Sequence, residues 1–159
     1  MEKLTLAQAD AIIEATFAKG GEMGFKPLTV AVLDDGGLMV AFKKQDNSSV
    51  LRFDIAQGKA YGAIGMGTNS RNLANVAKER PHFINALIGA SDGKVVPVAG
   101  GLLIKTSDGQ IIGATNSLAE RPTERSIGPN DFSALVYHSI GLKPDDTVDD
   151  LSGRPVHLL

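Results

Sequence analysis

Two pairs of short apolar segments, each joined by a turn that contains Asp-Gly, constrain the fold more than any other feature of this sequence. In the first pair, residues 28–33 are rich in β-branched side chains, residues 34–37 read Asp-Asp-Gly-Gly, and residues 38–43 resume an extended pattern. In the second pair, residues 101–106 and 110–115 flank Ser-Asp-Gly. Asp-Gly steps favour the tight turns that connect antiparallel strands. The sequence therefore predicts two β-hairpins.

Helical patterns precede, separate and follow these hairpins. Thr5 is a good N-cap for a first helix, whose apolar residues recur at helical spacing: Leu6, Ala9, Ile13 and Phe17. The segment between the hairpins is largely helical, with breaks at Pro81 and around residues 91–93, and residues 131–141 form a last helical segment. Because short-range hairpins dominate, we expect an α/β fold of the α+β kind, with a largely antiparallel sheet packed against helices.

Length and composition favour one globular domain. The chain has 159 residues, of which 43% are hydrophobic and 21% are charged. That composition is too apolar for a disordered polypeptide, and the chain is too short to divide into two well-packed domains. We expect the domain to span residues 1–142, followed by an extended C-terminal tail at residues 143–159, where Asp, Pro and Gly accumulate.

Charge and cysteine content exclude several classes of partner and chemistry. A net charge of -2 provides no general attraction to nucleic acid or to an anionic membrane. No apolar run approaches the roughly 20 residues that span a bilayer, and the N-terminus has no signal-peptide pattern. The absence of cysteine excludes disulfides, thiolate metal sites and thiol catalysis, and it agrees with a reducing compartment. We therefore expect a cytoplasmic protein that binds neither nucleic acid nor membranes.

The 18 glycines and the absence of tryptophan imply that some surfaces bring backbones close together. The densest case is residues 51–67, which predict a helix. At about 100° per residue, Ile55, Gly58, Gly62 and Gly65 lie on one stripe, beside a stripe of alanines at positions 56, 60 and 63. Each glycine inside a helix costs about 1 kcal/mol relative to alanine. We therefore expect another backbone or a flat ligand to occupy this face.

Two cationic residues, Arg52 and Lys59, lie between these stripes. A cationic strip beside small side chains is suited to hold a carboxylate or another anion. The alternative is that both side chains extend past the packed face to water. The glycines at positions 62, 65 and 67 do not predict a nucleotide-binding loop, because they follow a helical pattern and not a strand.

Seven short stretches occur in an order that is typical of one known family. They lie at residues 4–7, 27–32, 35–37, 54–60, 96–101, 109 and 112–114. In these stretches the chain resembles the GlcG/HbpS-like family of haem-degrading or haem-binding domains, and it is similar to the C-terminal part of some corrinoid adenosyltransferases. The resemblance is strongest over residues 4–115. It implies a profilin-like α/β sandwich that assembles into homo-oligomers and binds haem.

The chain departs from the family pattern after residue 114. Family members typically continue with Gly-Val-Ser-Gly and an acidic residue, whereas residues 115–122 read Thr-Asn-Ser-Leu-Ala-Glu-Arg-Pro. This end of the sheet borders the ligand region that the resemblance implies. Asn116 is therefore a candidate ligand-binding residue, and Tyr137 with His138 forms a candidate pocket or interface pair.

Haem is the first candidate ligand. Its iron needs an axial ligand such as His or Tyr, and its propionates need Arg or Lys. In this interpretation Arg52 and Lys59 hold the propionates, and one of three residues approaches the iron: Tyr61, His82 or His138. No two histidines have the spacing of a metal-binding pair and no carboxylate cluster lies near them, so we expect no protein-bound metal site.

Two other interpretations stay open. In the first, the chain is a cofactor-free enzyme of the lyase or isomerase type that acts on a small carboxylated metabolite, with or without an aromatic ring. Lys59 or Arg52 would hold the carboxylate, and the general acid or base would be one of three residues: Tyr61, His82 or Glu120. Alternatively the chain is a non-enzymatic, oligomeric structural or sensory module, because it has no nucleophile elbow, no cysteine nucleophile and no metal motif.

Overall fold

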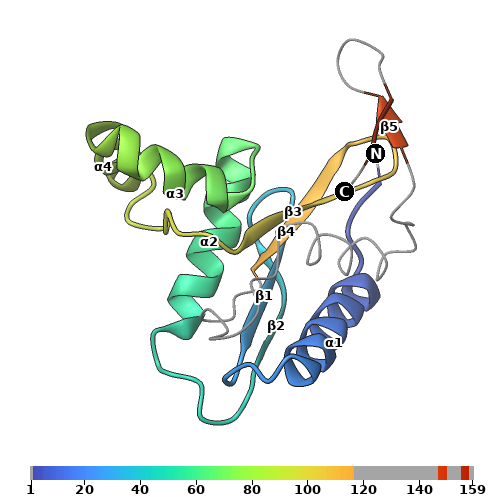
Figure 1. The fold of residues 1–159 in the computed structure, drawn as a ribbon. Coiled ribbons are helices and arrows are strands. Elements are labelled where there is room, and N and C mark those ends of the chain that lie inside the picture. The colour runs from blue at the N-terminus through green and yellow to red at the C-terminus, as the bar shows by residue number, and fades with distance from the viewer. Residues whose placement is uncertain (1, 117–146, 150–154, 158–159) are drawn as a thin grey trace.

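The computed structural model describes residues 2–116, 147–149 and 155–157. Figure 1 shows the elements in chain order. They are α1 (Leu6–Glu22), β1 (Thr29–Asp34), β2 (Met39–Lys44), α2 (Arg52–Met66), α3 (Ser70–Glu79), α4 (Pro81–Ala90), β3 (Gly101–Lys105), β4 (Ile111–Asn116), β5 (Thr147–Asp149) and β6 (Pro155–His157). The glutamate at position 120, the Tyr137–His138 pair and the predicted helix at 131–141 lie outside the described residues.

Both predicted hairpins are present, and together they form one antiparallel sheet. Its strand order is β2-β1-β4-β3, so the two hairpins meet where β1 pairs with β4. In the first hairpin, Asp34 Oδ1 accepts hydrogen bonds from the backbone N–H groups of Gly36 and Leu38, at 3.0 and 2.8 Å. Gly37 has a φ of 79°, which glycine adopts without strain. The predicted α+β fold with an antiparallel sheet is confirmed.

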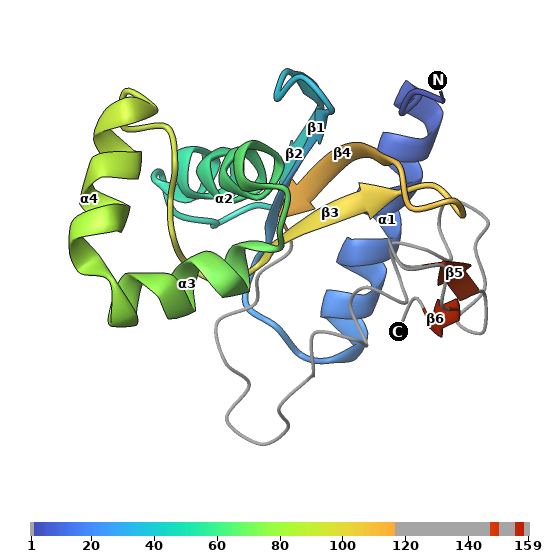
Figure 2. The same cartoon turned by 90° about the horizontal axis from the view of Figure 1, so that it is seen from above.

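The sheet lies between two helices, because successive side chains of a strand point to opposite faces. Ile12 and Ile13 of α1 pack against one face, with Val30, Val32 and Ile104 among the residues of that cluster. On the other face, Ala60 and Ala63 of α2 pack against Leu33, Leu103 and Ala114. Figure 2 shows the sheet with α1 on one side and α2 on the other. The small side chains of α2 bring that helix close to the strands.

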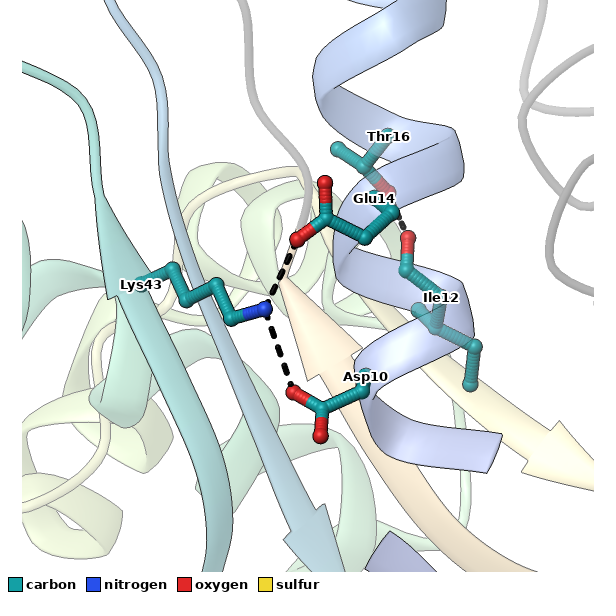
Figure 3. Close-up of polar contacts among 5 residues, drawn as sticks. All are labelled: Asp10, Ile12, Glu14, Thr16 and Lys43. Carbon is teal, nitrogen blue, oxygen red and sulfur yellow. Dashed lines mark hydrogen bonds and ion pairs between the residues drawn. The ribbon is translucent and has the colours of Figure 1, made fainter. Parts of the chain in front are cut away.

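The first helix begins at the predicted cap and is tied to the sheet at its polar border. The Thr5 side chain and Gln8 form a reciprocal capping box. Lys43 of β2 lies 2.7 Å from Glu14 Oε1 and 3.3 Å from Asp10 Oδ1, as Figure 3 shows. Hydrogen bonds to Glu14 and then to Asp10 raise the pKa of Lys43. Inside the helix, Thr16 Oγ1 donates to the Ile12 carbonyl at 2.7 Å (Figure 3).

The remaining helices extend away from the sheet. The predicted breaks occur at Arg80–Pro81, which separates α3 from α4, and at residues 91–93, which end α4. In Figure 2, α4 lies at the far side of α2 from the strands. The short strands β5 and β6 pair with each other in antiparallel fashion within the predicted tail. Among the described helices, none has the length and apolarity that crossing a membrane requires.

Candidate functional site

At Gly58 and Gly62, the glycine face of α2 is covered by other segments of the same chain. A Cβ atom added at Gly58 would lie 2.7 Å from the carbonyl oxygen of Lys94, and one added at Gly62 would lie 3.1 Å from side-chain atoms of Leu73 and Val95. The Val96 N–H also donates to the Gly58 carbonyl at 3.1 Å. Of the two occupants that the sequence allowed, another backbone and a flat ligand, backbone is present at Gly58, whereas side chains of Leu73 and Val95 cover Gly62.

Gly65 does not share this role. It is exposed, and a Cβ atom there would meet nothing within 4 Å. The stripe of glycines therefore has one position where backbone excludes a side chain (Gly58), one that is tightly packed (Gly62) and one that is open (Gly65).

Lys59 is the most unusual group on α2. Only 3% of its surface is exposed, so the alternative in which its side chain reaches water is wrong. Within the described part of the chain, its ammonium group has no hydrogen-bond or ion-pair partner. Burial, and to a smaller extent the positive charge of Arg52, lower the pKa of Lys59 to about 8.

The backbone around Lys59 is held against the end of the sheet. A Cβ atom at Gly101 of β3 would lie 2.7 Å from the Lys59 carbonyl carbon, so only glycine fits there. Gly101 pairs with Asn116 of β4. Arg52 is half-buried and precedes Lys59 by two helical turns, which places it on nearly the same side of α2. Arg52 and Lys59 therefore lie on nearly the same side of α2, and their role as an anion-binding strip stays a prediction.

The candidate residue Asn116 is held by the backbone of β1. Its Oδ1 accepts from the Ala31 N–H at 2.9 Å, and its Nδ2 donates to the Thr29 carbonyl at 3.4 Å. The side chain is 3% exposed. Asn116 thus continues the β1–β4 ladder beyond the last backbone pair, Val32 with Thr115.

A groove lies along a different side of α2. It has a volume of about 510 Å³ and is lined by the hairpin turn at 36–38, by Asp54, Gln57, Gly58 and Tyr61 of α2, and by residues 92–94 and Val96. The Lys94 ammonium lies 5.8 Å from the centroid of the Tyr61 ring. Tyr61 follows Lys59 by two residues, or about 200° around the helix axis. The side chains of Lys59 and Tyr61, both predicted as site residues, therefore point to different sides of α2.

The other predicted site residues are not gathered here. His82 is the exposed second residue of α4, which lies beyond α2 from the sheet in Figure 2. Glu120, Tyr137 and His138 fall outside the described residues. Among the residues that are described, no three His, Cys, Asp or Glu side chains are placed together to hold a metal ion.

Of the side chains that line the groove, the sequence predicted only Tyr61 as a site residue. Asp54, Gln57 and Tyr61 recur at helical spacing, so the same 100° pattern that identified the glycine stripe would have placed them on one face. Lys94 carries no such signal, because it belongs to a loop whose position depends on the packing of residues 94–96 against α2.

Comparison with known proteins agrees with this fold. The family model described as haem degrading protein HbpS-like matches residues 4–116. The crystal structure of a PduOC–haem complex is 22% identical, with a TM-score of 0.64, and the match covers 72% of this chain and 81% of that one. Klebsiella pneumoniae protein ORFY, of the family DUF336, is 21% identical with a TM-score of 0.66, over 87% of this chain and 89% of that one.

A double mutant of Streptomyces reticuli HbpS is also similar. It is 21% identical with a TM-score of 0.61, over 73% of this chain and 74% of that one. At these identities the structures establish a shared fold. No curated protein matches the chain at a significant level.

Proposed function

The chain belongs to the HbpS-like family, and from this we propose that it is a small-ligand-binding domain whose ligand carries a carboxylate held by Lys59, with Arg52 beside it. Haem is the first candidate for that ligand. The family's description as haem-degrading and the haem bound in the PduOC complex support this choice. A homo-oligomeric state and a cytoplasmic location are parts of the same proposal.

The buried ammonium of Lys59 carries the proposal. A charged group out of water is costly unless it is paired, and this one has no partner among the described residues. The positive charge of Arg52 makes the charged form of Lys59 still less favourable, which also lowers the Lys59 pKa. A ligand carboxylate beside Lys59 would compensate for both effects. Residues that reduce stability and are kept in a fold are commonly those that bind or react.

Haem would bind at this site through its propionates. Lys59 would hold one propionate, and when bound the group would supply a redox-active iron. Of the three predicted iron ligands, Tyr61 and His82 are among the described residues, and neither lies beside Lys59. Tyr61 is about 200° around α2 from Lys59, and His82 is on α4. His138 is the remaining candidate for the iron, and it lies outside the described residues.

Titration with haemin and with metal-free protoporphyrin IX tests the proposal. Both carry the same propionates, so we expect saturable binding of both at one per chain, with a sharpened Soret band for haemin. Lys59→Met should weaken the binding of haemin and of protoporphyrin IX about tenfold, which is the size expected for one charge-assisted contact. Lys78→Met, which changes an exposed lysine of α3, is the matched control. Titrations that do not saturate, or equal affinities for Lys59→Met and the wild type, would exclude this role.

A second candidate function is a cofactor-free lyase or isomerase that acts on a small carboxylated metabolite. Lys59, with Arg52 beside it, would hold the carboxylate of such a metabolite in the same way as a propionate. The predicted acid or base is Tyr61, His82 or Glu120, of which the first two lie away from Lys59. Thermal shifts with small carboxylates, in the absence of any shift with protoporphyrin IX, would favour this candidate.

The non-enzymatic, oligomeric module remains the third candidate. Native mass spectrometry separates it from the other two, because it predicts subunit assembly with no retained small molecule. A bound mass that is lost in Lys59→Met would support either ligand-binding function.

A further inference from the structure

We infer that the groove along α2 binds a small organic cation, with the ring of Tyr61 as its platform and Asp54 and Asp92 as its counter-charges. The inference concerns a different surface from the Lys59 site, a ligand of opposite charge and a different set of side chains. It therefore stands or falls independently of the proposed function.

The Tyr61 ring already faces a cation. The Lys94 ammonium lies 5.8 Å from the ring centroid, within the roughly 6 Å at which an ammonium is attracted to an aromatic face. The ring is held in place by the hairpin turn, because a Cβ atom added at Gly37 would lie 3.0 Å from Tyr61 Cδ2 and Cε2. The side chain of Lys94 is exposed and long, so a ligand ammonium is able to replace it.

The charge of the groove favours a cationic ligand. Its charged lining consists of the two carboxylates Asp54 and Asp92 and the single ammonium of Lys94. Neither carboxylate has an ion-pair partner within 4.0 Å among the described residues. The groove therefore keeps one negative charge beyond what Lys94 balances. A ligand ammonium that displaces Lys94 from the ring would leave Lys94 free to move into water.

The size and chemistry of the lining favour an organic cation over a metal ion. A volume of about 510 Å³ lies in the range of small-molecule sites. In the part of the chain that is described, no third His, Cys, Asp or Glu joins the two carboxylates to complete a metal site. Gln57 adds an amide that can donate to or accept from a polar group of the ligand. Leu38, 70% exposed at the rim, offers apolar contact to a methylated ammonium.

The test compares choline with 3,3-dimethylbutan-1-ol, its uncharged carbon isostere. Ligand-observed NMR reports binding, and an upfield shift of the methyl protons reports contact with the Tyr61 ring. We expect choline to bind about tenfold more tightly than the isostere. Tyr61→Phe should keep this preference, whereas Tyr61→Leu and Asp54→Asn should each reduce it. Lys94→Gln should increase the affinity for choline about threefold, because the competing cation is removed.

Three results would overturn the inference. One is equal binding of choline and the isostere to the wild type. A second is weaker choline binding by Lys94→Gln, which would mean that Lys94 supports the ligand site and does not compete with the ligand for the Tyr61 ring. Asp54→Asn changes an exposed side chain, so it keeps the test decisive if Tyr61→Leu does not fold. Competition by magnesium chloride at the same concentration as choline would assign the groove to a metal ion and would also overturn the inference.

Discussion

Gly58 and Val96 are joined by a hydrogen bond that a side chain at position 58 would prevent. The Val96 N–H donates to the Gly58 carbonyl at 3.1 Å, and the loop passes so close that a Cβ atom at Gly58 would lie 2.7 Å from the Lys94 carbonyl oxygen. This contact positions residues 94–96 on α2. It thereby forms one wall of the groove and closes the glycine face.

Gly58→Ala is therefore expected to destabilise the protein by about 2–4 kcal/mol, because backbone must move to admit the methyl group. Gly65→Ala is the matched control on the same helix. Since position 65 is open, the alanine should stabilise by about 0.5–1 kcal/mol. Urea unfolding of both variants measures the difference. Equal effects at the two positions would contradict the close approach at Gly58.

Lys59→Met is expected to stabilise the ligand-free protein at pH 7 by about 1–3 kcal/mol. The substitution keeps an unbranched side chain and removes a buried charge that has no partner among the described residues. Urea unfolding of the ligand-free protein measures the gain, with Lys78→Met as the exposed control. A loss of stability in Lys59→Met would show that the ammonium is compensated within the chain.

The stability of the wild type should rise with pH between about 8 and 10.5. The folded-state pKa of Lys59 is lowered from 10.5 to about 8, so in this window the unfolded chain binds more protons than the folded one. The free energy of unfolding then increases with pH. The penalty is fully present below pH 8 and disappears towards pH 10.5. The difference in unfolding free energy between Lys59→Met and the wild type should narrow over the same window, and a constant difference would contradict the lowered pKa.

The affinity for a carboxylate ligand at Lys59 should fall as pH rises, whereas the stability of the ligand-free protein rises. A bound anion stabilises the ammonium form, so the ligand is expected to bind best below pH 8 and more weakly above it. Protoporphyrin IX binding measured from pH 7 to 9.5 tests this. In Lys59→Arg the decline should be absent, because a guanidinium keeps its proton over this range.

Asn116→Ala is expected to cost about 1–3 kcal/mol. The substitution removes the acceptor of the Ala31 N–H and leaves that buried group without its hydrogen bond. Asn72→Ala is the control, because the side chain of Asn72 donates a hydrogen bond to Thr68 at an exposed site. Hydrogen exchange at the Ala31 amide should accelerate in Asn116→Ala and stay slow in Asn72→Ala. An unchanged exchange rate would mean that Asn116 does not protect β1.

The hairpins and the first helix could be predicted because their signals are local. Asp34 accepts hydrogen bonds from residues two and four positions further on, and Thr5 with Gln8 caps α1 within one turn. Interactions of this range depend on neighbouring residue types alone. The periodicity of residues 51–67 likewise identified the α2 face that needs close approach, as Gly58 and Gly62 show.

Which residues cover those helix faces could not be predicted from the sequence, because it depends on the tertiary structure. Lys59 and Tyr61 are two residues apart on α2, yet Lys59 is buried at the end of the sheet and Tyr61 lines a groove. Asn116 binds the backbone of a strand 85 residues earlier, and Lys94 reaches Tyr61 from a loop. Residue type and spacing specify which side of a helix must be covered. What covers it is set by contacts between distant segments, which form only when burial of the whole core brings them together.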